Sequence, residues 1–79
     1  MKLRPAIAAG LARHGIAATD GDTAEALRER LNDLYLEDVR RLKGRQVSGG
    51  IPLKEYATHV QALKESYPLL GLPLALWTE

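Results

Sequence analysis

The segment from residue 23 to residue 43 constrains the fold most, because apolar side chains recur along it at helical spacing. These side chains are Ala24, Leu27, Leu31, Leu34, Tyr35, Val39 and Leu42. Their positions drift with the 3.6-residue period of an α-helix. A helix of about 21 residues is roughly 30 Å long, which is the diameter of a small domain. Acidic residues near its start and basic residues near its end complement the helix dipole. We therefore predict one long helix over residues 23–43.

Two shorter segments show the same kind of periodicity. Residues 4–14 contain Pro5, which suits a first helical turn, and Gly15 behind them provides a C-terminal stop. Along residues 52–66, spacings of three and four residues alternate between the apolar side chains Leu53, Tyr56, Val60, Leu63 and Tyr67. A short glycine-rich turn joins the second and third helices, so they should pack as an antiparallel hairpin with the first helix lying across it. The predicted fold is all-α.

The small size of the chain limits what its core can contribute. With 79 residues, it should form one domain over residues 1–79, and such a core supplies no more than about 3–5 kcal/mol. The chain has no cysteine, which excludes disulfides and thiolate metal sites, and no motif calls for a cofactor. Closely packed helices or self-association are the remaining sources of stability.

The last dozen residues form an almost wholly apolar tail. Pro68 and Pro73 prevent one continuous helix, so we expect an extended tail over residues 67–79. In one interpretation the tail crosses the hairpin as a strap that completes the core. In the other it is an exposed patch that binds a second copy or another protein, with a tryptophan as anchor. The partner-binding residues would then be Leu69, Leu70, Leu72, Leu74, Leu76 and Trp77.

One run of basic residues lies at the end of the predicted long helix. It consists of Arg40, Arg41, Lys43 and Arg45. Residues 1–39 carry a net charge of −2 and residues 40–79 a net charge of +3, within a total of +1. Such a basic end can contact the phosphates of nucleic acid. It is also typical of a solvated helix C-terminus, where basic side chains favour the dipole.

Two parts of the chain resemble known helical modules. Residues 3–31 resemble the SAP-type helix–extended loop–helix through Leu11, the Gly15–Ile16 pair, Gly21 and the run Leu27–Leu31. That resemblance implies DNA or RNA binding through the start of the second helix. Residues 40–66 resemble the short helical module called SHOCT, through the stretch from Gly49 to Tyr56. This second resemblance implies an accessory or oligomerising module without catalysis.

Catalytic and metal-binding patterns are weak throughout the chain. Ser48 and Ser66 lack the surroundings of a nucleophilic serine. Glu55 and His59 are one turn apart and could be two metal ligands, but no third ligand is visible, so a surface carboxylate beside a histidine is the favoured interpretation. His14, next to a helix stop, is expected to interact with the last carbonyls of that helix. We therefore predict that the protein is not an enzyme.

The distribution of apolar residues also bears on location. No apolar run approaches the roughly 20 residues that a membrane span needs, and the start of the chain lacks a signal-peptide pattern. We expect a cytoplasmic protein with no membrane partner. The leading hypothesis is a small helical protein that acts through protein–protein contacts, most simply as a homodimer. Nucleic-acid binding through the basic run is the alternative.

Overall fold

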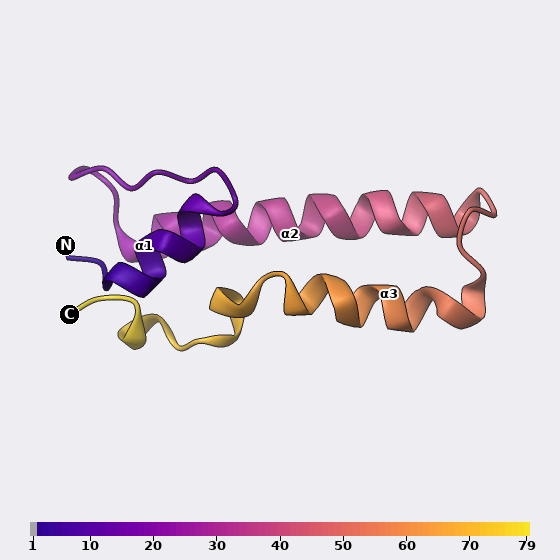
Figure 1. The fold of residues 1–79 in the computed structure, drawn as a ribbon. Helices are drawn as coiled ribbons and strands as arrows, with labels where there is room; N and C mark the ends of the chain where they lie inside the picture. Colours follow the sequence, from indigo (N-terminus) through magenta and orange to yellow (C-terminus); the bar gives the residue numbers. More distant parts are fainter. Residues whose placement is uncertain (1) are drawn as a thin grey trace.

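The computed structural model describes residues 2–79 and is built from helices. In chain order these are α1 (Pro5–Ala12), α2 (Ala24–Val47), α3 (Leu53–Glu65) and two short 3-10 helices, η1 (Pro68–Gly71) and η2 (Leu74–Leu76). Figure 1 shows α2 and α3 running antiparallel as a long hairpin, with α1 and the tail gathered at the end away from the hairpin turn. The all-α fold and the antiparallel hairpin are confirmed.

The end of α2 differs from the sequence prediction. The helix continues through Gly44, where a stop was predicted, and ends in a Schellman motif at Gly49, whose φ is +89°. The Gly50 N–H donates to the Arg45 carbonyl at 2.8 Å, and the Gly49 N–H donates to the Gln46 carbonyl at 3.2 Å. These two bonds satisfy carbonyls that the helix end would otherwise leave without partners. They outweigh the cost of about 1 kcal/mol that a glycine imposes inside a helix.

The loop before α2 is fixed by local hydrogen bonds. The Thr23 hydroxyl accepts from the Ala26 N–H at 3.1 Å, so Thr23 is the N-cap. The Asp22 carboxylate accepts instead from the Thr19 N–H at 2.9 Å and from Arg30 at 2.8 Å. Hydrogen bonds from the Thr19 backbone, then from its hydroxyl, and the nearby Arg30 charge lower the pKa of Asp22. The segment between α1 and α2 is therefore an ordered turn.

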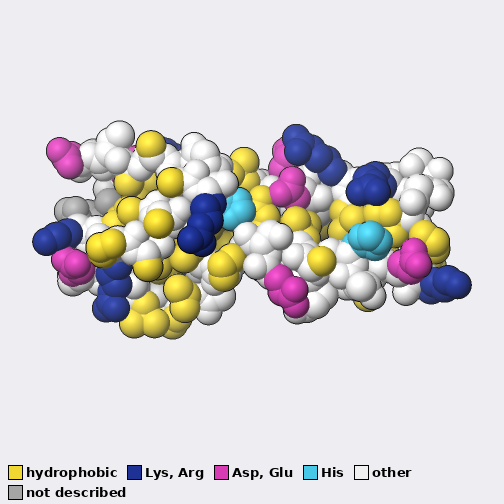
Figure 2. Space-filling model, in the orientation of Figure 1, with side chains coloured by type: hydrophobic (Ala, Val, Ile, Leu, Met, Phe, Trp, Pro, Cys, Tyr) yellow, Lys and Arg dark blue, Asp and Glu magenta, His cyan; other side chains and the backbone are white. Residues whose placement is uncertain are grey.

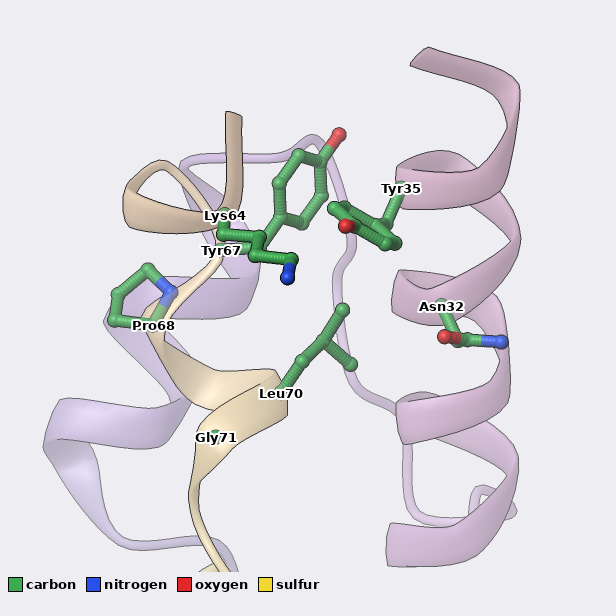
Figure 3. Close-up of a pocket in the computed structure, with 7 residues that line it drawn as sticks. All are labelled: Asn32, Tyr35, Lys64, Tyr67, Pro68, Leu70 and Gly71. Atoms are coloured by element: carbon green, nitrogen blue, oxygen red, sulfur yellow. The ribbon is translucent and has the colours of Figure 1, made fainter. Parts of the chain in front are cut away.

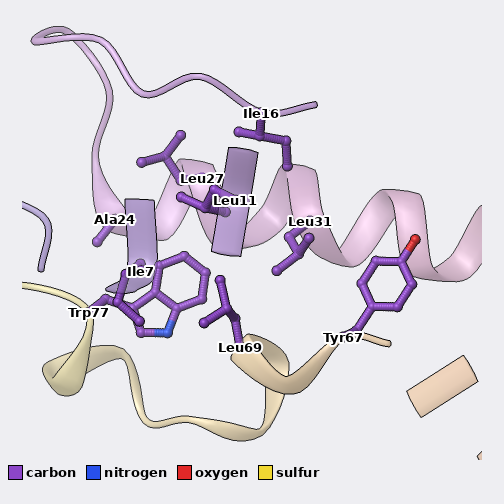
Figure 4. Close-up of a cluster of buried hydrophobic side chains, with 9 residues drawn as sticks. All are labelled: Ile7, Leu11, Ile16, Ala24, Leu27, Leu31, Tyr67, Leu69 and Trp77. Carbon is purple, nitrogen blue, oxygen red and sulfur yellow. The ribbon is translucent and has the colours of Figure 1, made fainter. Parts of the chain in front are cut away.

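The core lies at one end of the molecule. Its buried members are Ile7, Leu11, Ile16, Ala24, Leu27, Leu31, Tyr67, Leu69 and Trp77. They come from α1 and the turn after it, the first half of α2, and the tail, whereas α3 contributes no buried residue. Figure 4 shows the indole ring of Trp77 pointing from the tail into this cluster, beside Ile7 and Leu69. The tail, rather than α3, completes the core.

A close crossing at Gly10 and two backbone hydrogen bonds hold the tail against α1 and the start of the chain. A Cβ atom on Gly10 would lie only 2.8 Å from Leu69 Cδ1, so the absence of a side chain lets the tail cross α1 closely. The Arg4 N–H donates to the Trp77 carbonyl, and the Glu79 N–H donates to the Lys2 carbonyl, both at 3.0 Å. The tail is therefore a strap, and the ends of the described chain lie side by side (Figure 1).

The molecule is elongated for its size. It measures 44 × 18 × 17 Å, and its radius of gyration is 14.7 Å, whereas a compact domain of this length has a radius of about 12 Å. The distal half of the hairpin, near its turn, is only two helices thick. Within residues 2–79, the buried apolar side chains outside the main core are those of Leu42 and Ile51. Two helices alone cannot cover all the apolar side chains that they carry.

Candidate functional site

The six tail residues considered for partner binding have different surroundings. Leu69 and Trp77 are buried, so neither can anchor a partner on this conformation of the chain. Leu70 and Leu74 are half-buried against the core. Leu72 and Leu76 point outward, with 36% and 43% of their surfaces exposed. Four of the six side chains thus pack in the core or against it, which leaves Leu72 and Leu76 as the members of this set that face solvent.

An incompletely covered apolar area lies along one side of the α2–α3 hairpin. On α2, a stripe at helical spacing contains Asn32, Leu36, Val39 and Lys43, and on α3 a matching stripe contains Leu53, Ala57, Val60 and Lys64. We call the five apolar members of these stripes (Leu36, Val39, Leu53, Ala57 and Val60) the apolar face.

Two contacts between α2 and α3 show that the stripes lie on the same side of the hairpin. Asn32 and Lys64 line one pocket, and the Lys43 ammonium lies 5.4 Å from the centre of the Tyr56 ring.

The side chains of the apolar face are incompletely covered. Leu53 is 69% exposed and Leu36 is 40% exposed, while Val39 and Val60 are half-buried. Sequence periodicity placed Val39, Leu53 and Val60 on core-facing stripes. In the structure none of the three is fully buried. The tail packs on the core at the other end of the hairpin, so these positions are covered only in part within residues 2–79.

A pocket adjoins the apolar face where the tail leaves α3. It has a volume of about 350 Å³ and is lined by Asn32, Tyr35, Lys64, Tyr67, Pro68, Leu70 and Gly71. Figure 3 shows the side chains of Tyr35, Tyr67 and Leu70 and the Lys64 amino group pointing toward a common space. Its walls are mainly apolar, which suits an inserted apolar side chain better than a chemical reaction.

Tyr67 holds the pocket wall in place through three contacts. Its hydroxyl donates to Asp38 at 2.5 Å, its ring stacks on His14 with centroids 4.3 Å apart, and Tyr35 meets it edge-on at 5.4 Å. Burial, followed by the hydrogen bond and the charge of Asp38, raises the pKa of Tyr67 to about 12. His14, expected to interact with helix carbonyls, here packs on an aromatic ring. These contacts set the position of the Tyr67 ring in the pocket wall.

The four residues of the basic run do not share one surface. Arg41 and Arg45 are one helical turn apart and line a groove beside α3. Lys43 lies over Tyr56 on the other side of α2. Arg40 points away from α3, with Glu37 at 4.0 Å. The 100° rotation between successive helical residues separates side chains that are neighbours in sequence.

The other sequence candidates have local roles. The hydroxyls of Ser48 and Ser66 donate to the carbonyls of Arg45 and Ala62, at 3.1 and 3.3 Å. Across residues 2–79, no three potential metal-ligating side chains come together, so Glu55 and His59 gain no third ligand there. None of the helices in this part of the chain combines the length and apolarity that crossing a membrane requires.

Comparison with known proteins adds no template for the site. The chain matches no protein-family model, no curated protein and no solved structure.

Proposed function

We propose that this is a non-enzymatic helical protein that acts through protein contacts and forms a homodimer through the apolar face of its hairpin. The main support for a homodimer is the large surface area of the single chain. The chain exposes 5350 Å², whereas a compact monomer of 8.7 kDa exposes about 4,700 Å². The difference, about 600 Å², is close to the roughly 800 Å² that each partner buries in a standard interface.

The arrangement of the face fits a helical bundle. Its two stripes follow i, i+4, i+7 spacing on antiparallel helices, which is the pattern that packs ridges into grooves on a second pair of helices. Two such hairpins face to face form a four-helix bundle. The distal half of each hairpin, now two helices thick, then acquires a core. Dimerisation would also stabilise the fold, because a domain this small has a core that contributes little on its own.

Charge along α2 favours a second copy of the chain as the occupant. Glu29, Leu36 and Lys43 follow one another at seven-residue intervals, so they lie nearly in line along the side of α2 that carries the apolar face. If two α2 helices cross antiparallel near Leu36, Glu29 lies opposite the partner subunit's Lys43. A two-fold axis makes this pairing twice, because the same patch serves both subunits. Opposite charges at both ends of this crossing also fix the register in which the two α2 helices pair.

Cysteine cross-linking tests this geometry directly, because the natural chain has no cysteine. We expect Leu36→Cys to form an intermolecular disulfide rapidly under mild oxidation, since the two-fold axis places both copies near each other. Thr58→Cys, on the exposed outer side of α3, is the matched control and should cross-link slowly. Equal rates for the two variants would contradict the proposed interface, and circular dichroism would show that both remain helical.

The alternative function, nucleic-acid binding through the basic run, has less support. A phosphate backbone is bound through several cations on one surface, and Arg40, Arg41 and Lys43 point in different directions from α2. The alternative would be favoured by a salt-dependent mobility shift with DNA or RNA that disappears in the Arg40→Glu/Arg41→Glu variant.

A further inference from the structure

A second surface feature lies on the side of the hairpin away from the apolar face. It is a groove of about 340 Å³ lined by Asp38, Arg41, Leu42, Arg45, His59, Ala62, Leu63 and Ser66. Arg41 and Arg45 come from successive turns of α2, and His59 comes from α3 on the facing wall. Figure 2 shows this side, with a histidine lying among basic side chains over the distal half of the hairpin. Two helices thus bring three nitrogen-bearing side chains to one groove.

The charges in this groove are only partly compensated. Arg41 lies 3.7 Å from Glu37 and 3.5 Å from Asp38, in weak ion pairs at 71% side-chain exposure. Asp38 is also the acceptor for the Tyr67 hydroxyl. Within residues 2–79, neither the Arg45 guanidinium nor the His59 ring forms an ion pair or a hydrogen bond. The end of the groove near the hairpin turn therefore presents donors without an acceptor.

The floor of the groove is apolar. Leu42 is buried and Leu63 half-buried, and both lie between the Arg45 side and the His59 side. An inorganic ion would use the donors and leave this floor wet. A ligand with an anionic head and an apolar body would use both, because its body would remove the apolar floor from water.

We propose that the groove binds a phosphate monoester carried on a small apolar body. A guanidinium fork matches two phosphate oxygens at once, and a phosphate offers three acceptor oxygens. The two arginines and His59 supply donors from both walls, and the body of the ligand lies on Leu42 and Leu63. The groove and the apolar face are on different sides of the hairpin, so this binding is independent of the proposed dimer.

Titration followed by NMR, at fixed pH and ionic strength, tests the proposal with phenyl phosphate as the probe. We expect saturable shifts at the His59 ring and at Arg45. Phenyl phosphate should bind roughly tenfold more tightly than inorganic phosphate, the difference that burying about 55 Å² of apolar surface produces. Equal affinity for the two would contradict the role of the floor. Phenol, which lacks the anionic head, should produce no saturable shift.

Variants distinguish this site from general ionic attraction. Arg45→Gln and His59→Ala should each weaken phenyl phosphate binding at least about fivefold, since the first removes a charged guanidinium fork and the second removes a hydrogen-bond donor. Arg40→Gln removes the same charge from the same helix but from outside the groove, and should leave affinity unchanged. Equal losses in Arg45→Gln and Arg40→Gln would overturn the proposal. Tighter binding of a single-stranded oligonucleotide that requires Arg40 and Lys43 would overturn it in favour of nucleic-acid binding.

Discussion

Adding a methyl group at Gly10 tests how the tail crosses α1. A Cβ atom there would lie 2.8 Å from Leu69 Cδ1, 3.1 Å from its Cγ and 3.3 Å from its Cδ2. Rotation about the Cβ–Cγ bond of Leu69 moves its methyl groups but leaves its Cγ in place, and Leu69 is buried in the core. The Gly10→Ala substitution therefore requires Leu69 to move, either by changing rotamer inside the packed core or by a shift of the tail.

The expected sign follows from two opposing free energies. Replacing glycine by alanine inside a helix stabilises it by about 1 kcal/mol, whereas overpacking a core costs about 1–3 kcal/mol. We expect Gly10→Ala to lower the free energy of unfolding by about 1 kcal/mol, which shifts the midpoint of thermal unfolding by about 4–8 °C in a domain of this size. Circular dichroism against temperature measures it.

A double-mutant cycle isolates the contact. In a Leu69→Ala background the clashing atoms are gone, so Gly10→Ala should stabilise by up to about 1 kcal/mol, giving a coupling energy of about 2 kcal/mol. Leu69→Ala alone costs about 2–5 kcal/mol, so the cycle is measured in a stabilising osmolyte. If Gly10→Ala stabilises the natural chain as much as the Leu69→Ala variant, the tail does not cross α1 at Gly10 and the reasoning is refuted.

Three further perturbations test other parts of the fold. Because the pKa of Tyr67 is raised from 10.0 to about 12, the stability it contributes is complete below pH 10 and is lost as the pH rises to about 12. Tyr67→Phe should flatten that loss in alkaline unfolding curves, and an unchanged slope would contradict the burial of the Tyr67 hydroxyl beside Asp38. Thr23→Ala should cost about 1 kcal/mol by removing the N-cap bond, with Thr23→Ser nearly neutral in urea unfolding. Gly49→Ala should cost about 1 kcal/mol because φ at Gly49 is +89°, whereas Gly44→Ala should stabilise, since Gly44 is helical and a Cβ there meets nothing within 4 Å.

Periodicity predicted the helices well because each has an apolar stripe of its own. The stop at Gly15 is confirmed by a φ of +76° and by the bond from the Ile16 N–H to the Leu11 carbonyl. The end of α2 was misplaced because Gly44 and Gly49 are both plausible stops. The choice depends on which glycine can bring the next N–H groups back to the helix carbonyls, and sequence spacing does not show that.

The covering of each stripe could not be predicted, because periodicity identifies a face but not what packs on it. The tail has no helical period, yet it supplies Leu69 and Trp77 to the core and leaves Leu53 and Val60 on α3 without a full cover. The different directions of the side chains in the basic run could have been predicted from the sequence. At 100° per residue, Arg41 and Arg45 share a side of α2, and Lys43 lies on another.

The molar mass in solution tests the proposed homodimer most directly. Light scattering or sedimentation equilibrium at micromolar concentrations should give twice the 8.7 kDa chain mass. Leu53→Glu places a charge on a side chain that is 69% exposed in the single chain, so it should leave the helices folded and return the mass to that of one chain. Thr58→Glu, the control on the outer side of α3, should remain dimeric. A natural chain that stays at 8.7 kDa across this concentration range would contradict the account.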